Sequence, residues 1–152
     1  MQLTELLIAI TIMAALSAIA IPNYHQMKET RLLHGVSDQL QNQIELAKTV
    51  SLTRNTTIYL CATQNQQNCN EDWKGQLAVY TSPDPKHIGQ IIKASKPLSP
   101  EVSIRFQAFN NNEYLSFNPS AELNYNGSFY LDTAHKSMRL TVSKTGIVST
   151  TP

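Results

Sequence analysis

The chain has 152 residues and a formal net charge of +1, so it allows one ordinary domain and carries no strong overall field that would select nucleic acid or acidic lipid. Charged residues make up only 15%, and none lies between Leu6 and Ile21. The remainder is polar and rich in Asn, Gln, Ser and Thr. This contrast predicts an apolar stalk joined to a water-exposed head.

The first 24 residues are mostly apolar, and Glu5 is the only charged side chain among them. A helix over Leu3–Ile21 would measure about 28 Å, close to the roughly 30 Å of a bilayer core. A signal peptide cleaved near Ala18–Ala20 would lack its basic segment, because no Lys or Arg precedes Lys28. An ordinary membrane anchor leaves the acid unexplained, since a carboxylate in hydrocarbon costs about 2.5–3.5 kcal/mol.

Residues beyond the apolar run predict a long amphipathic helix. Pro22 removes a backbone donor, which predicts a kink near Ala18–Ile21. Apolar residues then recur at helical spacing and indicate a stripe that packs on the head: Leu33, Val36, Leu40, Ile44, Ala47 and Val50. The more solvent-exposed face of this helix is expected to hold Lys28, Glu29, Arg31, Asp38, Gln41, Gln43, Glu45 and Lys48. One helix from about Leu3 to Leu52 would be roughly 75 Å long, with Gly35 as its weak point.

After Arg54, β-branched and aromatic runs separated by turn residues predict short strands. These runs are Thr56–Cys61, Gln76–Thr81, Gln90–Lys93, Val102–Phe109, Tyr114–Phe117, Ser128–Asp132, Met138–Ser143 and Ile147–Thr150. One long helix followed by many strands predicts an α+β fold with a mostly antiparallel β-sheet head. The expected parts are a transmembrane helix half (1–24), an amphipathic half packed on the head (25–54) and the β-rich head (55–152).

Two cysteines, Cys61 and Cys69, lie eight positions apart. Two thiols are too few for a structural zinc site, and the four histidines lack ligand spacing, so no metal or cofactor is predicted. With an N-terminus typical of export, a disulfide closing a short loop is favoured over two buried free thiols. In the chain-entropy model this bridge contributes about 2.5 kcal/mol.

The sequence contains no motif for catalysis. It has no glycine-rich phosphate loop, no Gly-x-Ser-x-Gly elbow and no paired His–carboxylate spacing. Asp84 near His87 is interpreted as a solvated turn, and Trp73 as an anchor of the head core. We therefore predict a protein that is not an enzyme and has no catalytic residues.

The stretch Leu3–Ile8, followed by Ala18–Tyr24, resembles the mature N-terminus of type IV pilins and pseudopilins. In that family a prepilin peptidase cuts after a glycine and N-methylates the new first residue. Glutamate stands at mature position five and proline near position twenty-two. The resemblance implies that Met1 is the methylated terminus, in place of the usual phenylalanine. It also implies that Glu5 pairs with the N-terminus of a neighbouring subunit and that Pro22 kinks the helix.

The head is similar to the GspH/FimT group of minor pilins, in which a helix is followed by two β-sheets and a cysteine pair brackets a loop. The similar segments are Ile58–Cys61, Cys69, Trp73, Leu115–Pro119, Gly127–Phe129, Met138–Ser143 and Thr145–Val148. The resemblance implies a FimU-like minor pilin that primes a type IV pilus or forms its tip with other minor pilins and the major pilin. It would cross the bacterial inner membrane once, with a periplasmic head, and residues 1–24 would lie in the filament core after assembly. A minor pseudopilin of a type II secretion system is the alternative.

A DNA-binding minor pilin for natural transformation is a third alternative, because some relatives in the group are implicated in DNA uptake. Its candidate contacts are Lys136, Arg139 and Lys144, which follow Asp132 without any acid between them. Phosphate binding needs several cations on one face. Three are few, and Gly146–Ser149 departs from the Gly-Arg-x-Arg-like signature of the DNA-binding relatives. A solvated sheet edge is therefore the favoured interpretation of these cations.

Overall fold

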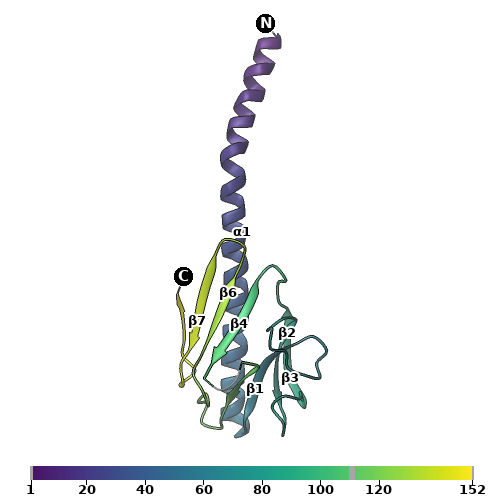
Figure 1. The fold of residues 1–152 in the computed structure, drawn as a ribbon, viewed down its shortest axis with the longest axis vertical. Coiled ribbons are helices and arrows are strands. Elements are labelled where there is room, and N and C mark those ends of the chain that lie inside the picture. The colour runs from purple at the N-terminus through teal and green to yellow at the C-terminus, as the bar shows by residue number, and fades with distance from the viewer. Residues whose placement is uncertain (1, 110–111, 152) are drawn as a thin grey trace.

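The computed structural model describes residues 2–109 and 112–151, without the side chains of residues 2 and 18–23. Its first element is a single helix, α1 (Gln2–Arg54), which at 1.5 Å per residue is about 80 Å long. Figure 1 shows the N-terminal part of α1 projecting beyond the head, while its C-terminal part lies against the sheets. The kink predicted near Ala18–Ile21 falls on residues whose side chains are outside the described part, and it stays a prediction.

In the part of the head that the structure describes, eight strands form two antiparallel sheets. They are β1 (Ile58–Thr63), β2 (Gln76–Thr81), β3 (Gln90–Pro97), β4 (Ser103–Ala108), β5 (Tyr114–Phe117), β6 (Gly127–Asp132), β7 (Ser137–Val142) and β8 (Val148–Thr151). The first sheet has the order β3-β2-β1-β5 and the second the order β4-β6-β7-β8. This arrangement confirms the predicted α+β fold, with strands that differ from the predicted runs by a few residues at their ends.

The apolar stripe of α1 packs into the head core, as predicted. Its buried members are Leu33, Val36, Leu40, Ile44 and Ala47. Burial of each Leu or Ile side chain contributes about 1.5–3 kcal/mol, so the stripe is enough to fix this half of α1 on the head. One polar assignment is wrong: Gln43 is only 6% exposed, because the strands cover more of the helix surface than a single stripe requires.

Three aromatic rings pack together in the head core, with Trp73 of the β1–β2 loop against two rings of the second sheet. The ring centroid of Trp73 lies 5.2 Å from that of Phe106 on β4 and 4.7 Å from that of Phe129 on β6. Its indole Nε1 donates a hydrogen bond of 2.8 Å to the carbonyl of Asn112. Trp73 is fully buried, which confirms that it anchors the head core.

Candidate assembly surface

The N-terminal part of α1 carries a continuous set of exposed apolar side chains. They are between 55% and 73% exposed and comprise Leu3, Leu6, Leu7, Ile8, Ile10, Ile12, Met13 and Leu16. The hydroxyls of Thr11 and Ser17 donate to the carbonyls of Ile8 and Met13, at 2.8 and 2.7 Å. Because these polar groups are satisfied within the helix, this surface suits apolar surroundings.

Glu5 lies in the first turn of α1 and is exposed among these apolar residues. The unpaired amides and the positive end of the helix dipole favour a carboxylate there. None of the ion pairs among the described residues includes Glu5. Met1 lies outside the described residues, as does the side chain of Pro22, so the roles of all three residues stay predictions. Within the described part, no helix has the length and apolarity needed to cross a membrane.

Polar contacts hold the head to α1 at the point where the helix leaves it. On one side, Lys28 Nζ lies 2.9 Å from a carboxylate oxygen of Glu101, in the loop before β4. On the other side, Glu29 accepts from the β6–β7 turn, with 2.8 Å to His135 Nδ1 and 3.2 Å to Thr133 Oγ1. These contacts fix the direction in which the free part of α1 projects from the head.

The hydrogen bond with His135, and after it the one from Thr133, holds the pKa of Glu29 below its ordinary value of 4.5. A carboxyl group with a lowered folded-state pKa stabilises the fold above its unfolded pKa and loses that contribution as the pH falls through the folded value. Between pH 5.5 and 3, the melting temperature of Glu29→Gln should therefore fall less than that of the wild type. Glu45→Gln, which removes an exposed carboxylate from the same helix, is the control and should follow the wild type. Parallel curves for all three chains would contradict the prediction.

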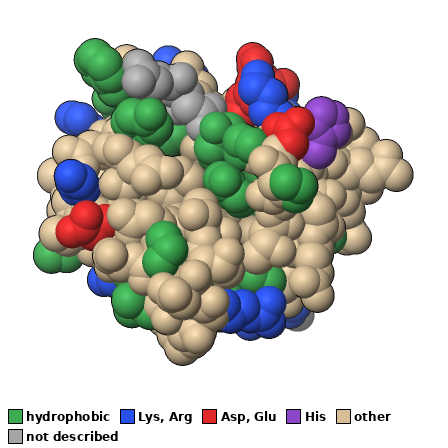
Figure 2. Space-filling model, turned by 90° about the horizontal axis from the view of Figure 1, so that it is seen from below, with side chains coloured by type: hydrophobic (Ala, Val, Ile, Leu, Met, Phe, Trp, Pro, Cys, Tyr) green, Lys and Arg blue, Asp and Glu red, His purple; other side chains and the backbone are tan. Residues whose placement is uncertain are grey.

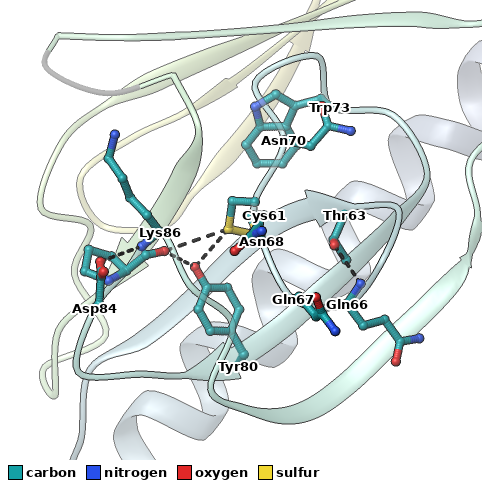
Figure 3. The surroundings of a disulfide bond; sticks show 12 residues. Cys61, Thr63, Gln66, Gln67, Asn68, Asn70, Trp73, Tyr80, Asp84 and Lys86 are labelled. Carbon is teal, nitrogen blue, oxygen red and sulfur yellow. Dashed lines mark hydrogen bonds between the residues drawn. A yellow bond between two sulfur atoms is a disulfide. The ribbon is translucent and has the colours of Figure 1, made fainter.

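The two cysteines predicted to pair are joined in the structure. Cys61 is buried on β1, and its Cα lies 5.7 Å from that of Cys69 in the following loop. The hydroxyl of Tyr80 lies 3.0 Å from Cys69 Sγ and donates to the carbonyl of Pro85 (Figure 3). Burial raises the pKa of Tyr80, which keeps this hydroxyl protonated as a donor. The disulfide therefore ties the β1–β2 loop to β1, and the Tyr80 hydroxyl links this loop to the β2–β3 turn.

Replacing both cysteines, as Cys61→Ala/Cys69→Ala, should lower the free energy of unfolding by about 2.5 kcal/mol, because the unfolded chain regains loop freedom. For a domain of this size that corresponds to roughly 10 °C or more in melting temperature. Calorimetry with and without a reductant would measure it. The reduced wild type should melt like the double variant, and the variant should not respond to the reductant. Equal melting of the oxidised wild type and the variant would refute the prediction.

The three cations considered as DNA contacts do not form one cluster. Lys136 precedes β7 and donates to Thr30 Oγ1 on α1 at 2.6 Å, whereas Lys144 follows the other end of β7. An extended chain of this length separates them by roughly 25 Å. Figure 2, which looks at the head from the end opposite the N-terminus, shows positive and negative side chains mixed at its margins and no continuous basic patch on that face. Arg139 is exposed on β7, as predicted.

The outer face of the second sheet holds a group that the sequence analysis missed. Strand register places Arg105, Tyr130 and Arg139 in one row across β4, β6 and β7. The guanidinium carbons lie 5.8 and 5.4 Å from the centre of the tyrosine ring, within cation–π range. Arg105 also pairs with Asp132 at 3.2 Å, so part of the positive charge is neutralised. The alternation within each strand indicates these positions, but the register that aligns them is set by distant residues.

The described residues contain no group of three or more His, Cys, Asp or Glu that could hold a metal ion. Asp84 and His87 are in contact, with 2.7 Å between Oδ2 and Nδ1, and both side chains are largely exposed on the β2–β3 turn. The backbone amide of Lys86, and then His87, lowers the pKa of Asp84, so this carboxylate is ionised and solvated. This geometry agrees with the interpretation of the pair as a turn.

Comparison with known proteins identifies the family. The model of the family described as type II transport protein GspH matches residues 36–146, more than half of the chain. The chain belongs to the GspH family. Its members are structural minor pilins and pseudopilins of the type IV pilin or type II secretion kind, which assemble with other pilins or pseudopilins. No curated protein matches the sequence.

Two solved structures share the fold. The type IV minor pilin FimU of Pseudomonas aeruginosa superimposes with a TM-score of 0.67 and 15% identity, over 83% of this chain and 92% of FimU. The minor pseudopilin EpsH from the type 2 secretion system of Vibrio cholerae gives 0.52 and 10% identity, over 76% and 93%. At these identities the likeness shows a common fold and does not distinguish the two systems.

Proposed function

We propose that this protein is a minor pilin of a type IV pilus, a non-enzymatic subunit that primes assembly or forms the pilus tip with other minor pilins and the major pilin. The observation that carries this proposal is the carboxylate of Glu5 at the start of an exposed apolar helix. A large apolar surface requires a cover, and a carboxylate buried by that cover requires a partner. A filament of like subunits supplies both, as apolar neighbouring helices and an N-terminal amine.

The proposed pathway begins in the bacterial inner membrane, which would hold the N-terminal part of α1 before assembly while the head lies in the periplasm. A prepilin peptidase would produce and methylate the terminus at Met1. The Cys61–Cys69 disulfide supports a periplasmic head, because disulfides persist in that oxidising compartment. The hydroxyls of Thr11 and Ser17 donate to carbonyls of the same helix, which supports apolar surroundings for this part of α1.

A minor pseudopilin of a type II secretion system is the second candidate, supported by the family description and the shared fold of EpsH. Deletion of the gene distinguishes the two: we expect loss of surface pili with normal protein secretion. The protein should also be detected by antibody in pili sheared from the wild type. Normal piliation combined with loss of secreted proteins would replace the pilus proposal with the secretion one.

DNA binding is not proposed. Lys136 and Lys144 lie at opposite ends of β7, and Lys136 donates a hydrogen bond to Thr30 on α1. The electrophoretic mobility of a short DNA duplex measures this directly. If the protein shifts the duplex, and the shift weakens steeply with salt and disappears in the triple Gln variant, DNA binding would have to be added to the function.

A further inference from the structure

A groove of about 900 Å³ lies between α1 and β3. One wall is formed by α1 between Arg31 and Leu46, and the other by the segment from Lys93 to Ser99. β3 is the end strand of its sheet, so its outer side faces away from β2, as Figure 1 shows. We refer to this feature as the α1–β3 groove.

The helix wall of the α1–β3 groove contains an unsatisfied hydrogen-bond acceptor. Gln43 is buried, and its Oε1 has no hydrogen-bond partner among the described residues. Buried amide oxygens in proteins are nearly always bonded, because an unbonded one loses its hydration without replacement. An N–H group entering the groove would supply the missing bond.

Gly35 lies on the same helix wall and leaves space in the groove. A Cβ added to Gly35 would meet nothing within 4 Å, so no packing requirement of the head excludes a side chain there. Glycine in a helix interior lowers helix stability relative to alanine. A ligand that approaches the helix backbone closely gives a physical reason for glycine at this position.

The charges around the α1–β3 groove have one sign. Arg31, Lys93 and Lys96 line it, and no acidic residue is among its described lining residues. None of the three takes part in an ion pair among the residues that the structure describes. Such a surface is complementary to carboxylates.

The backbone of β3 selects the form of the ligand. An end strand presents N–H and C=O groups that can pair with another extended chain. One such group is already used from the groove, since Gln39 Nε2 donates to the carbonyl of Lys96 at 2.8 Å. Lysines on an end strand hinder indiscriminate pairing. An added strand that carries carboxylates would instead be attracted by these lysines.

We propose that the α1–β3 groove binds an extended acidic segment of a neighbouring subunit, which pairs with the outer edge of β3 as an added strand. Its carboxylates contact Arg31, Lys93 and Lys96, and one of its N–H groups donates to Gln43 Oε1. Only the source of the segment rests on the proposed function. The selectivity for an extended acidic peptide rests on the groove itself.

The test uses the full chain in detergent micelles and two fluorescein-labelled, end-capped hexapeptides, one alternating Glu with Val and the other alternating Lys with Val. Fluorescence anisotropy should show binding of the Glu peptide at least about tenfold tighter than that of the Lys peptide, with an affinity that falls as salt is added. Absence of Glu-peptide binding up to millimolar protein, or equal affinity for the two peptides, would overturn the proposal.

Two variants locate the binding. Gly35→Phe fills the groove and should weaken Glu-peptide binding at least about tenfold, while Thr49→Phe, on an exposed position of the same helix, should not change it. Lys93→Gln/Lys96→Gln should weaken binding and reduce its salt dependence, while Lys144→Gln should not. If Gly35→Phe fails to fold, the lysine variants still test whether the groove binds the peptide. Binding that none of the groove variants changes would place the peptide elsewhere and refute the proposal.

The peptide measurement also separates this proposal from the proposed function. The Glu5→Ala chain should bind the Glu peptide like the wild type, because Glu5 lies on the part of α1 that projects from the head. Loss of peptide binding with normal piliation would therefore count against the groove alone. Normal peptide binding by a protein absent from pili would count against the proposed function alone.

Discussion

Substitution of Glu5 by alanine should remove the protein from assembled filaments while the head remains folded. If Glu5 pairs with the N-terminal amine of a neighbour inside an apolar filament core, the substitution leaves that amine buried without a partner. Breaking one side of a buried ion pair costs about 3–5 kcal/mol, which is more than a hundredfold in an assembly equilibrium. Immunodetection of the protein in sheared pili, relative to its total amount in the cell, measures this effect.

The matched control is Glu45→Ala, which removes an exposed carboxylate from the part of α1 that packs on the head. This variant should enter filaments at the wild-type level. Glu5→Asp keeps the charge but shortens the side chain by one methylene, so it should recover part of the incorporation if an ion pair is formed. Wild-type incorporation of Glu5→Ala would show that the carboxylate has no role in assembly.

The sequence predicted the parts of this fold that depend on local patterns. The helical spacing of Leu33, Val36 and Leu40 identifies a buried stripe because the period of a helix is fixed. The β-branched and aromatic runs identify the strands, although β1 begins at Ile58 rather than Thr56 and β3 continues to Pro97. Strand ends are set by turns and by pairing with distant strands, which a local pattern does not contain.

Features that depend on the third dimension were not predicted. Gln43 has a polar side chain on a helix with one apolar stripe, so its burial follows only from how the head packs against α1. The row of Arg105, Tyr130 and Arg139 requires the register of three strands. Gly35 is a weak helix position in the sequence, but in the structure it is the open wall of a groove. The candidate assembly residues near the N-terminus came from a resemblance to pilins rather than from packing.

Substitution of Trp73 by alanine should lower the free energy of unfolding by about 3–5 kcal/mol, a large fraction of the roughly 5–15 kcal/mol available to an ordinary domain. The indole is fully buried against Phe106 and Phe129, so its removal leaves a cavity between the β1–β2 loop and the second sheet. It also leaves the carbonyl of Asn112 without the hydrogen bond from Nε1. Denaturant unfolding followed by far-UV circular dichroism would measure the loss.

Two companion variants separate the contributions of the indole. Phe109→Ala removes an aromatic side chain that is 90% exposed, so it should change the free energy of unfolding by less than about 0.5 kcal/mol. Trp73→Phe keeps an aromatic ring against Phe106 and Phe129 but lacks the donor, so its free energy of unfolding should lie between those of Trp73→Ala and the wild type. If Trp73→Ala cost no more than Phe109→Ala, Trp73 would not be an anchor of the head core. The disulfide and the stripe of α1 would then have to hold the head together without it.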